Sequence, residues 1–252
     1  MLTSIRYILL TAFRDKLFIG VLIGVVCAAA ISATLGSTAF LEEQQMTLTY
    51  AAGSARLILA VGLIVFVCFH IRSAFDSKEI DVMLSRPISR SNLVVAYWLG
   101  FSVVALLLVV PVVGVIAALG LLNMEGYMGW AISLLLEASL VVALALFSAF
   151  TLKSAVTSVL ACMGFYVLSR MMAFFVIAAD APSMGQMPYL ILKYVLKAIS
   201  SIVPRLDFFA KTEWLVYGFT VPQEWYWFVL QAAIFIPLLL IAAILDFKRK
   251  QF

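Results

Sequence analysis

Two ionisable side chains of opposite sign lie inside long apolar stretches of the chain. Glu137 stands in the run WAISLLLEASLVVALALF, and Arg170 stands in the run AVTSVLACMGFYVLSRMMAFFVIAA. Counted from the outer ends of two predicted helices, they lie about 10 and 14 Å deep at about 1.5 Å per residue. Because a lone charge in hydrocarbon is unfavourable, we expect Glu137 and Arg170 to form an intramembrane ion pair. A structural role is the simpler interpretation, and a place in a translocation path is the alternative.

The other reactive side chains do not form a recognisable site. The single histidine, His70, cannot build a two-histidine metal site, and Cys27, Cys68 and Cys162 are far apart in the sequence. Neither a G-x-S-x-G motif nor a G-x-x-x-x-G-K-[ST] loop is present. We therefore expect no catalytic, cofactor-binding or metal-binding residue in this chain, and any ATP it uses must be bound by a partner. The methionines are interpreted as packing residues.

Composition defines the class of protein. Hydrophobic residues make up 65% of the chain and charged residues 12%, and the mean hydropathy is +1.13. Crossing a hydrocarbon core of about 30 Å takes about 20 helical residues. The pattern predicts an all-α integral membrane protein, a single membrane domain over 1–252 with six transmembrane helices. These are at about 17–36, 51–71, 93–122, 130–152, 154–179 and 225–245.

Two details of these spans carry their own predictions. Arg56 lies near the end of the second span, where its side chain is expected to reach the interface, and Pro111 is expected to interrupt the third. The first span repeats a small residue at every fourth position, and such a stripe lets two helix backbones approach closely. It packs either within the chain or across a dimer interface, and consists of Gly20, Gly24, Ala28, Ser32 and Gly36.

The distribution of Lys and Arg predicts that both termini are cytoplasmic. Residues 1–16 are expected to form an amphipathic helix on the cytoplasmic surface, and 180–224 an external segment. Within that segment, 188–203 is apolar but carries Lys193 and Lys197 one turn apart. We therefore expect an interfacial helix there, or one that dips partway into the membrane.

A mixed-charge segment at 72–91 separates the second and third spans. Pro87 forbids a continuous helix at that point, and Ser89 or Ser91 could cap the helix that follows. The run EIDVMLSRPISRSNLVVAYWLG at 79–100 resembles the same region of type-2 ATP-binding-cassette (ABC) exporter permeases. The matching residues are Glu79, Met83, Leu84, Pro87, Ser89 and Arg90.

A second run, VPRLDFFAKTEWLVYGFTVP at 203–222, resembles the segment before the last helix of bacterial members of that family. The matching residues are Pro204, Leu206, Phe209, Gly218 and Pro222. The basic, aromatic C-terminal end at 246–252 is similar as well. The resemblance covers nearly the whole chain.

The resemblance implies a permease subunit that pairs with a second permease chain, as a homodimer or heterodimer, and with a P-loop ATPase that binds ATP and Mg. It implies ATP-driven export across the cytoplasmic (inner) membrane of a bacterium, contacts with membrane lipid and not with nucleic acid, and short re-entrant external helices before the last span. It also implies that residues 72–91 couple the chain to the ATPase, with the amphipathic N-terminus as a second contact. The coupling residues implied are Asp76, Lys78, Glu79, Asp81, Met83, Leu84, Arg86, Pro87, Ser89 and Arg90.

Two other functions remain open from the sequence. One is an accessory scaffold of an ABC-type complex that moves no solute. The other is an ATP-independent secondary carrier, for which charged or unwound helix segments are expected near the midplane in both halves of the chain. The apolar spans suit a lipid, a hydrophobic drug or a peptide, and the sequence does not discriminate among these substrates.

Overall fold

The computed structural model describes residues 16–38, 42–80, 89–179, 194–196, 198–199, 203–219 and 224–249. The predicted surface helix at 1–16 lies outside these residues except for Lys16. Most of the predicted interfacial helix at 188–203 lies outside them too.

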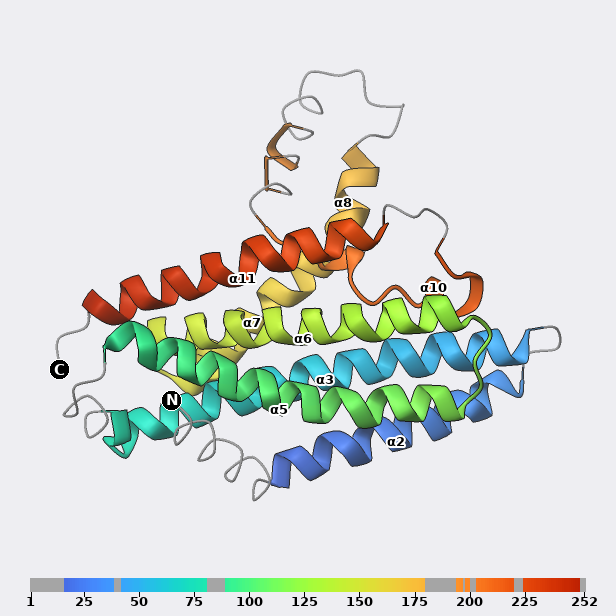
Figure 1. Ribbon diagram of the computed structural model, residues 1–252, viewed down its shortest axis with the longest axis horizontal. Coiled ribbons are helices and arrows are strands. Elements are labelled where there is room, and N and C mark those ends of the chain that lie inside the picture. Colours follow the sequence, from blue (N-terminus) through green and yellow to red (C-terminus); the bar gives the residue numbers. More distant parts are fainter. Residues whose placement is uncertain are drawn as a thin grey trace.

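The described part of the chain is helical throughout its regular elements (Figure 1). Five of its helices are long and apolar enough to cross a membrane, which agrees with the predicted all-α, multi-pass membrane protein. They are α2 (Lys16–Gly36), α3 (Glu43–Asp76), α5 (Arg90–Ala118), α6 (Met124–Thr151) and α11 (Glu224–Arg249).

The predicted span at 154–179 is divided into two helices. α7 (Ala155–Arg170) has 16 residues and α8 (Met172–Ala179) has 8, with Met171 between them. At about 1.5 Å per residue, α7 alone extends about 24 Å, less than a hydrocarbon core of about 30 Å. The division falls directly after Arg170, whose guanidinium group binds backbone carbonyls of a distant segment. One uninterrupted helix over 154–179 was therefore the wrong expectation.

Two further helices differ from expectation. α3 has 34 residues and begins at Glu43, so Arg56 lies well inside it and not near its end. α5 continues through Pro111 without a break. Membrane helices tolerate proline because the surrounding helix turns and neighbouring helices satisfy the freed backbone groups.

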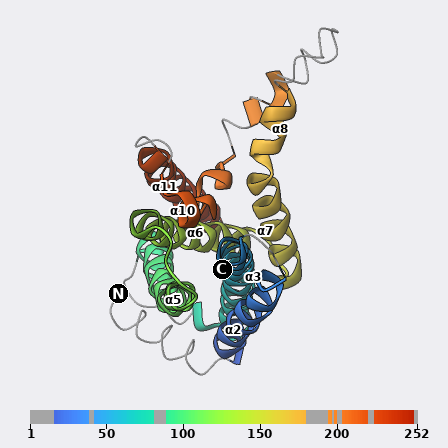
Figure 2. The ribbon, with the colours of Figure 1, turned by 90° about the vertical axis from the view of Figure 1, so that its right-hand side faces the viewer.

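α6 is the central helix of the bundle. It contacts α3, α5, α7 and α11, and also α10 (Glu213–Tyr217), while α2 packs against α3 and α5 (Figure 2). Large apolar side chains remain exposed on α2 and α11, which suits contact with lipid or with another membrane chain. They include Ile19, Ile23, Val26, Ile31 and Leu35 of α2 and Leu230, Ile234, Leu238, Ile241 and Leu245 of α11.

The two ends of the bundle are built from different helix termini (Figure 1). The end of α3, the start of α5, the end of α6 and the end of α11 lie together, and we call this the Arg90 end. The end of α2, the starts of α3 and α6, the end of α5 and α10 lie at the opposite end, the Asn123 end. Side chains cap the N-termini of α5 and α6. Ser89 Oγ accepts a hydrogen bond from Asn92 N (3.2 Å), and Asn123 Oδ1 accepts one from Gly126 N (2.8 Å).

Candidate functional site

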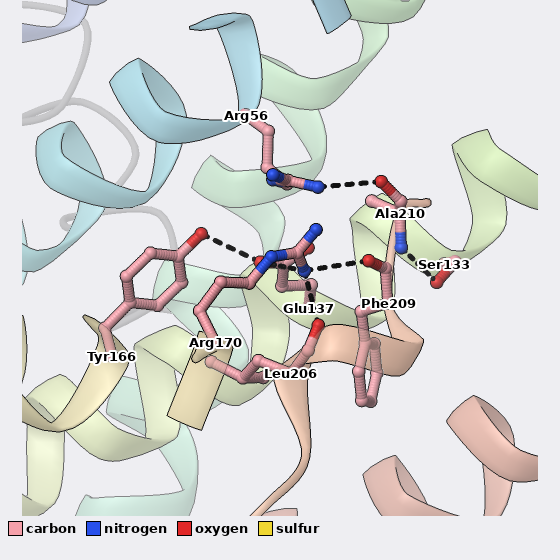
Figure 3. A network of polar contacts seen from close by, with 8 residues as sticks. All are labelled: Arg56, Ser133, Glu137, Tyr166, Arg170, Leu206, Phe209 and Ala210. Atoms are coloured by element: carbon pink, nitrogen blue, oxygen red, sulfur yellow. Dashed lines mark hydrogen bonds and ion pairs between the residues drawn. The ribbon is translucent and has the colours of Figure 1, made fainter. Parts of the chain in front are cut away.

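Glu137 lies on α6 where that helix contacts α7, and its side chain is only 2% exposed. The hydroxyl of Tyr166 donates a hydrogen bond of 2.9 Å to Glu137 Oε1 (Figure 3). Nη1 of Arg170 lies 3.8 Å from the same oxygen. The structure thus brings Glu137 and Arg170 together, with Tyr166 as the closer partner of the carboxylate.

Arg170 binds backbone more closely than it binds Glu137. Its Nη1 donates hydrogen bonds to the carbonyl oxygens of Phe209 (2.8 Å) and Leu206. Both acceptors lie in or next to the short 3₁₀ helix η1 (Leu206–Phe208). The guanidinium group therefore connects α7 to the segment at 203–212.

Arg56 connects α3 to the same segment. Its Nη1 donates a hydrogen bond of 2.8 Å to the carbonyl oxygen of Ala210, and Ala210 N donates one of 2.9 Å to Ser133 Oγ on α6. Arg56 and Glu137 each lie about 20 Å along their helices from the Asn123 end, at about 1.5 Å per residue. The Arg56 side chain is thus bound to backbone inside the bundle, and Arg56 does not lie near the end of its helix as predicted.

The segment at 203–212 supplies the backbone groups that these side chains bind. Leu206, Phe209 and Ala210 are fully buried, and the chain there is largely non-helical. Buried backbone outside regular helices must find its hydrogen-bond partners elsewhere in the protein. Five side chains supply or support those partners, and we call them the Glu137 cluster: Arg56, Ser133, Glu137, Tyr166 and Arg170.

The Glu137 cluster is not neutral. It holds two guanidinium groups and one carboxylate, and the charge of Arg56 also attracts Glu137. The nearby Arg205 and Asp207 neutralise one another at 2.8 Å. Among the described residues, Glu137 Oε2 and Arg56 Nε are buried without a hydrogen-bond partner. The cluster therefore has excess positive charge and unused hydrogen-bonding capacity.

Between the Glu137 cluster and the Arg90 end of the bundle, α6 and α7 pack against each other. Ser148 Oγ donates to the carbonyl of Ser158 (3.2 Å), and Ser158 Oγ donates to that of Ser148 (3.3 Å). At the same contact between α6 and α7, Cys162 Sγ approaches the carbonyl of Leu144 at 3.7 Å, and Cys68 Sγ of α3 approaches that of Ala145 at 3.8 Å. A mostly apolar crevice of about 250 Å³ opens beside this contact, between α6, α7 and α11.

The predicted coupling segment is described at both of its ends. Arg72 and Asp76 form an ion pair of 2.6 Å in the last turns of α3, and Lys78 follows with a positive φ of 58°. Glu79 is half-buried, while Ser89 and Arg90 begin α5. The remaining predicted coupling residues lie outside the described part of the chain: Asp81, Met83, Leu84, Arg86 and Pro87.

Arg90 connects this segment to α11. Its Nη1 donates to the carbonyl oxygens of Phe247 and Lys248, each at 3.2 Å, and its guanidinium carbon lies 5.8 Å from the centre of the Phe247 ring. The C-terminal end of a helix favours a nearby cation, because its last carbonyl groups lack helical partners.

The small-residue stripe of α2 packs mainly within the chain. Gly36 lies against Glu43 and Thr47 of α3, and Gly24 lies against Ile58. Ser32 is buried and Ala28 is half-buried, while Gly20 is exposed with no side chain near it. Close packing of α2 on α3 therefore uses most of the stripe.

The sequence analysis missed Tyr166, Ser133 and the role of Arg56. Tyr166 precedes Arg170 by one helical turn, so it lies on the same face, and that spacing was an available signal. Ser133 precedes Glu137 by one turn in the same way. The sequence analysis also did not predict that Cys68 and Cys162 both approach carbonyl groups of α6. In the described ranges, no three His, Cys, Asp or Glu side chains gather as a metal site.

No protein-family model matches the chain, and no curated protein sequence matches it.

Proposed function

We propose that this chain is the permease subunit of a type-2 ABC exporter, in which a separate P-loop ATPase subunit supplies the energy. The observation that carries the proposal is the hydrogen bonding of Arg90 to the last turn of α11. Arg90 ends the Pro-hydrophobic-Ser-Arg turn that resembles the coupling region of these permeases. One side chain thus connects the segment at 72–91 to the last transmembrane helix.

Aromatic packing beneath Arg90 supports the same proposal. Phe75 of α3, Phe150 of α6 and Phe247 of α11 pack with ring centroids 5.0 to 6.4 Å apart, and Tyr97 of α5 lies 6.5 Å from Phe150. Packed side chains of this kind transmit displacement because protein interiors are dense. A partner that pushes on residues 72–91 would therefore displace four helices together.

The proposed mechanism needs two arrangements of the helix bundle and a bias between them. ATP closes the ATPase dimer, the segment at 72–91 moves with it, and two paired permease chains alternate between inward and outward access. In this proposal the helix bundle can adopt two arrangements, and ATP binding and hydrolysis by the ATPase shift the equilibrium between them. Asp76, Lys78 and Glu79 are the described residues proposed to contact the ATPase.

An ATP-independent carrier is the second candidate, and two observations favour it. The division between α7 and α8 and the non-helical backbone at 203–212 both occur beside buried charges, and carriers often build their sites from broken helices. This candidate would need no ATPase partner.

Purification of the tagged chain from native membranes in mild detergent separates the two candidates. The permease proposal expects a P-loop ATPase to co-purify, detected by mass spectrometry, and to hydrolyse ATP. A Glu79→Lys variant should lose the ATPase, while Glu213→Lys, an exposed reversal at the Asn123 end, should retain it. A chain that purifies without any ATPase would refute the permease proposal and favour the carrier.

A further inference from the structure

A positively charged cluster and an apolar crevice lie along the same pair of helices. From Glu137 to Leu144 is two turns of α6, about 10 Å, and from Tyr166 to Cys162 is about one turn of α7, about 6 Å. Glu137 and Tyr166 belong to the Glu137 cluster, whereas Leu144 and Cys162 line the crevice. A molecule with a polar head and an apolar chain could therefore contact both.

The net charge of the Glu137 cluster determines which charge a bound headgroup must carry. Arg56 and Arg170 face one carboxylate, so one positive charge stays uncompensated even when Glu137 is ionised. The backbone carbonyl groups at 203–212 offset only part of that charge, because they are dipoles and not anions. A fifth of the Arg170 side chain is exposed, and Arg56 Nε is a buried donor without a partner. An anionic group fits these donors, and a cationic group would be repelled.

The lining and volume of the crevice indicate what the apolar part of the ligand is. Its walls include Leu144, Phe147 and Leu152 of α6, Ala161 and Phe165 of α7, and Leu239 of α11. α7 and α11 lie on either side of α6 (Figure 2). With a volume of about 250 Å³ the crevice is smaller than typical drug-sized sites. It suits part of one acyl chain, and the remainder of that chain would lie in the bilayer.

We propose that the Glu137 cluster and this crevice together bind a single-chain amphiphile with an anionic headgroup. The headgroup pairs with the excess charge of Arg170 and Arg56, and the chain lies in the crevice between α6, α7 and α11. That such a molecule is exported rests on the function proposed above, whereas its binding does not.

Equilibrium binding to the purified chain in phosphatidylcholine nanodiscs tests the headgroup. Radiolabelled palmitate should bind saturably and about tenfold more tightly than hexadecanol, which has the same chain length without the charge. Hexadecyltrimethylammonium should not displace it. Equal affinity for palmitate and hexadecanol, or no saturable palmitate binding, would overturn the proposal. Displacement of palmitate by an equal concentration of the two-chain lipid phosphatidylglycerol would overturn the assignment to a single chain.

Two substitutions on α7 test the crevice without touching the Glu137 cluster. Ala161→Phe places a ring in the crevice and should weaken palmitate binding about tenfold. Leu160→Phe adds similar bulk on an outward face, where Leu160 is 66% exposed, and should leave binding unchanged. Unchanged affinity in Ala161→Phe would refute the crevice as the chain site. Because this assay contains no ATPase, failure of the permease proposal would leave its result intact, and failure here would leave the ATPase partner untouched.

Discussion

The hydroxyl of Tyr166 on α7 donates a hydrogen bond of 2.9 Å to Glu137 Oε1 on α6, deep inside the helix bundle. Tyr166 is a closer partner of that oxygen than Arg170, whose guanidinium nitrogen lies 3.8 Å from it. A neutral donor thus holds the carboxylate in place, while both arginines of the cluster bind the backbone at 203–212.

Replacing Tyr166 by Phe should lower the free energy of unfolding by about 1–3 kcal/mol, because a buried carboxylate oxygen loses its donor. Thermal unfolding in detergent measures the change. Tyr217→Phe is the matched control: that hydroxyl is exposed and lies 3.4 Å from Gln45, so its loss should have little effect. Equal effects of the two substitutions would show that the buried hydrogen bond contributes nothing specific.

Glu137→Gln and Arg170→Met should each destabilise the protein, and the double variant should lose less than the sum of the two. We expect a coupling free energy of about 0.5–3 kcal/mol, since removing one partner leaves the other buried and uncompensated. The double variant should remain less stable than the natural protein, because Arg170 also binds the carbonyl of Phe209.

The ion pair between Arg72 and Asp76 provides a comparison for that cycle. Its atoms lie closer, at 2.6 Å, but its side chains are 35% and 59% exposed. An exposed pair one helical turn apart should couple by less than about 0.5 kcal/mol. Strict additivity at Glu137 and Arg170 would contradict an energetic interaction between these two side chains.

Gly126→Ala should destabilise the packing of α10 on α6. An added Cβ at this position would overlap the carbonyl oxygen of Trp214, which is backbone and cannot rotate away. We expect a loss of about 1–3 kcal/mol, as for other overpacked sites. Gly164→Ala on α7 meets no atom within 4 Å and should be neutral or stabilising by up to about 1 kcal/mol. Chemical unfolding of both variants gives the comparison.

Arg90→Met should loosen the last turn of α11, because the carbonyl groups of Phe247 and Lys248 lose their donor. Hydrogen exchange over 240–249 should become faster, with little change elsewhere in the described helices. Lys153→Met removes an exposed cation at the same end and should leave exchange in α11 unchanged. Identical exchange in Arg90→Met and the natural protein would remove the proposed connection between α5 and α11.

The pairing of Glu137 with Arg170 was predictable because charges are rare in apolar runs and must find partners there. The full extent of the site was not. Arg56 was assigned to the interface because the second span was placed from residue 51 onward, whereas α3 begins at Glu43. The polar sequence EQQMTLT at its start hid that extra length.

The burial of the segment at 203–212 was harder to predict from its own residues. Its residues look like an external loop. Their burial depends on partners from three helices that are distant in sequence: the donors Arg56 and Arg170 and the acceptor Ser133. The division at Met171 is similar, since α7 and α8 together read as one apolar run. Local pattern predicts a helix in such cases, while tertiary hydrogen bonding decides where helix and loop meet.

The most direct test of the permease proposal is the ATPase activity of the reconstituted complex. The chain and its co-purified ATPase should be placed in vesicles, and ATP hydrolysis compared between the natural chain, Glu79→Lys and the Glu213→Lys control. The account predicts that the chain stimulates hydrolysis and that Glu79→Lys abolishes this stimulation with membrane insertion intact, while Glu213→Lys behaves normally. Hydrolysis that is independent of the chain, or full stimulation by Glu79→Lys, would contradict it.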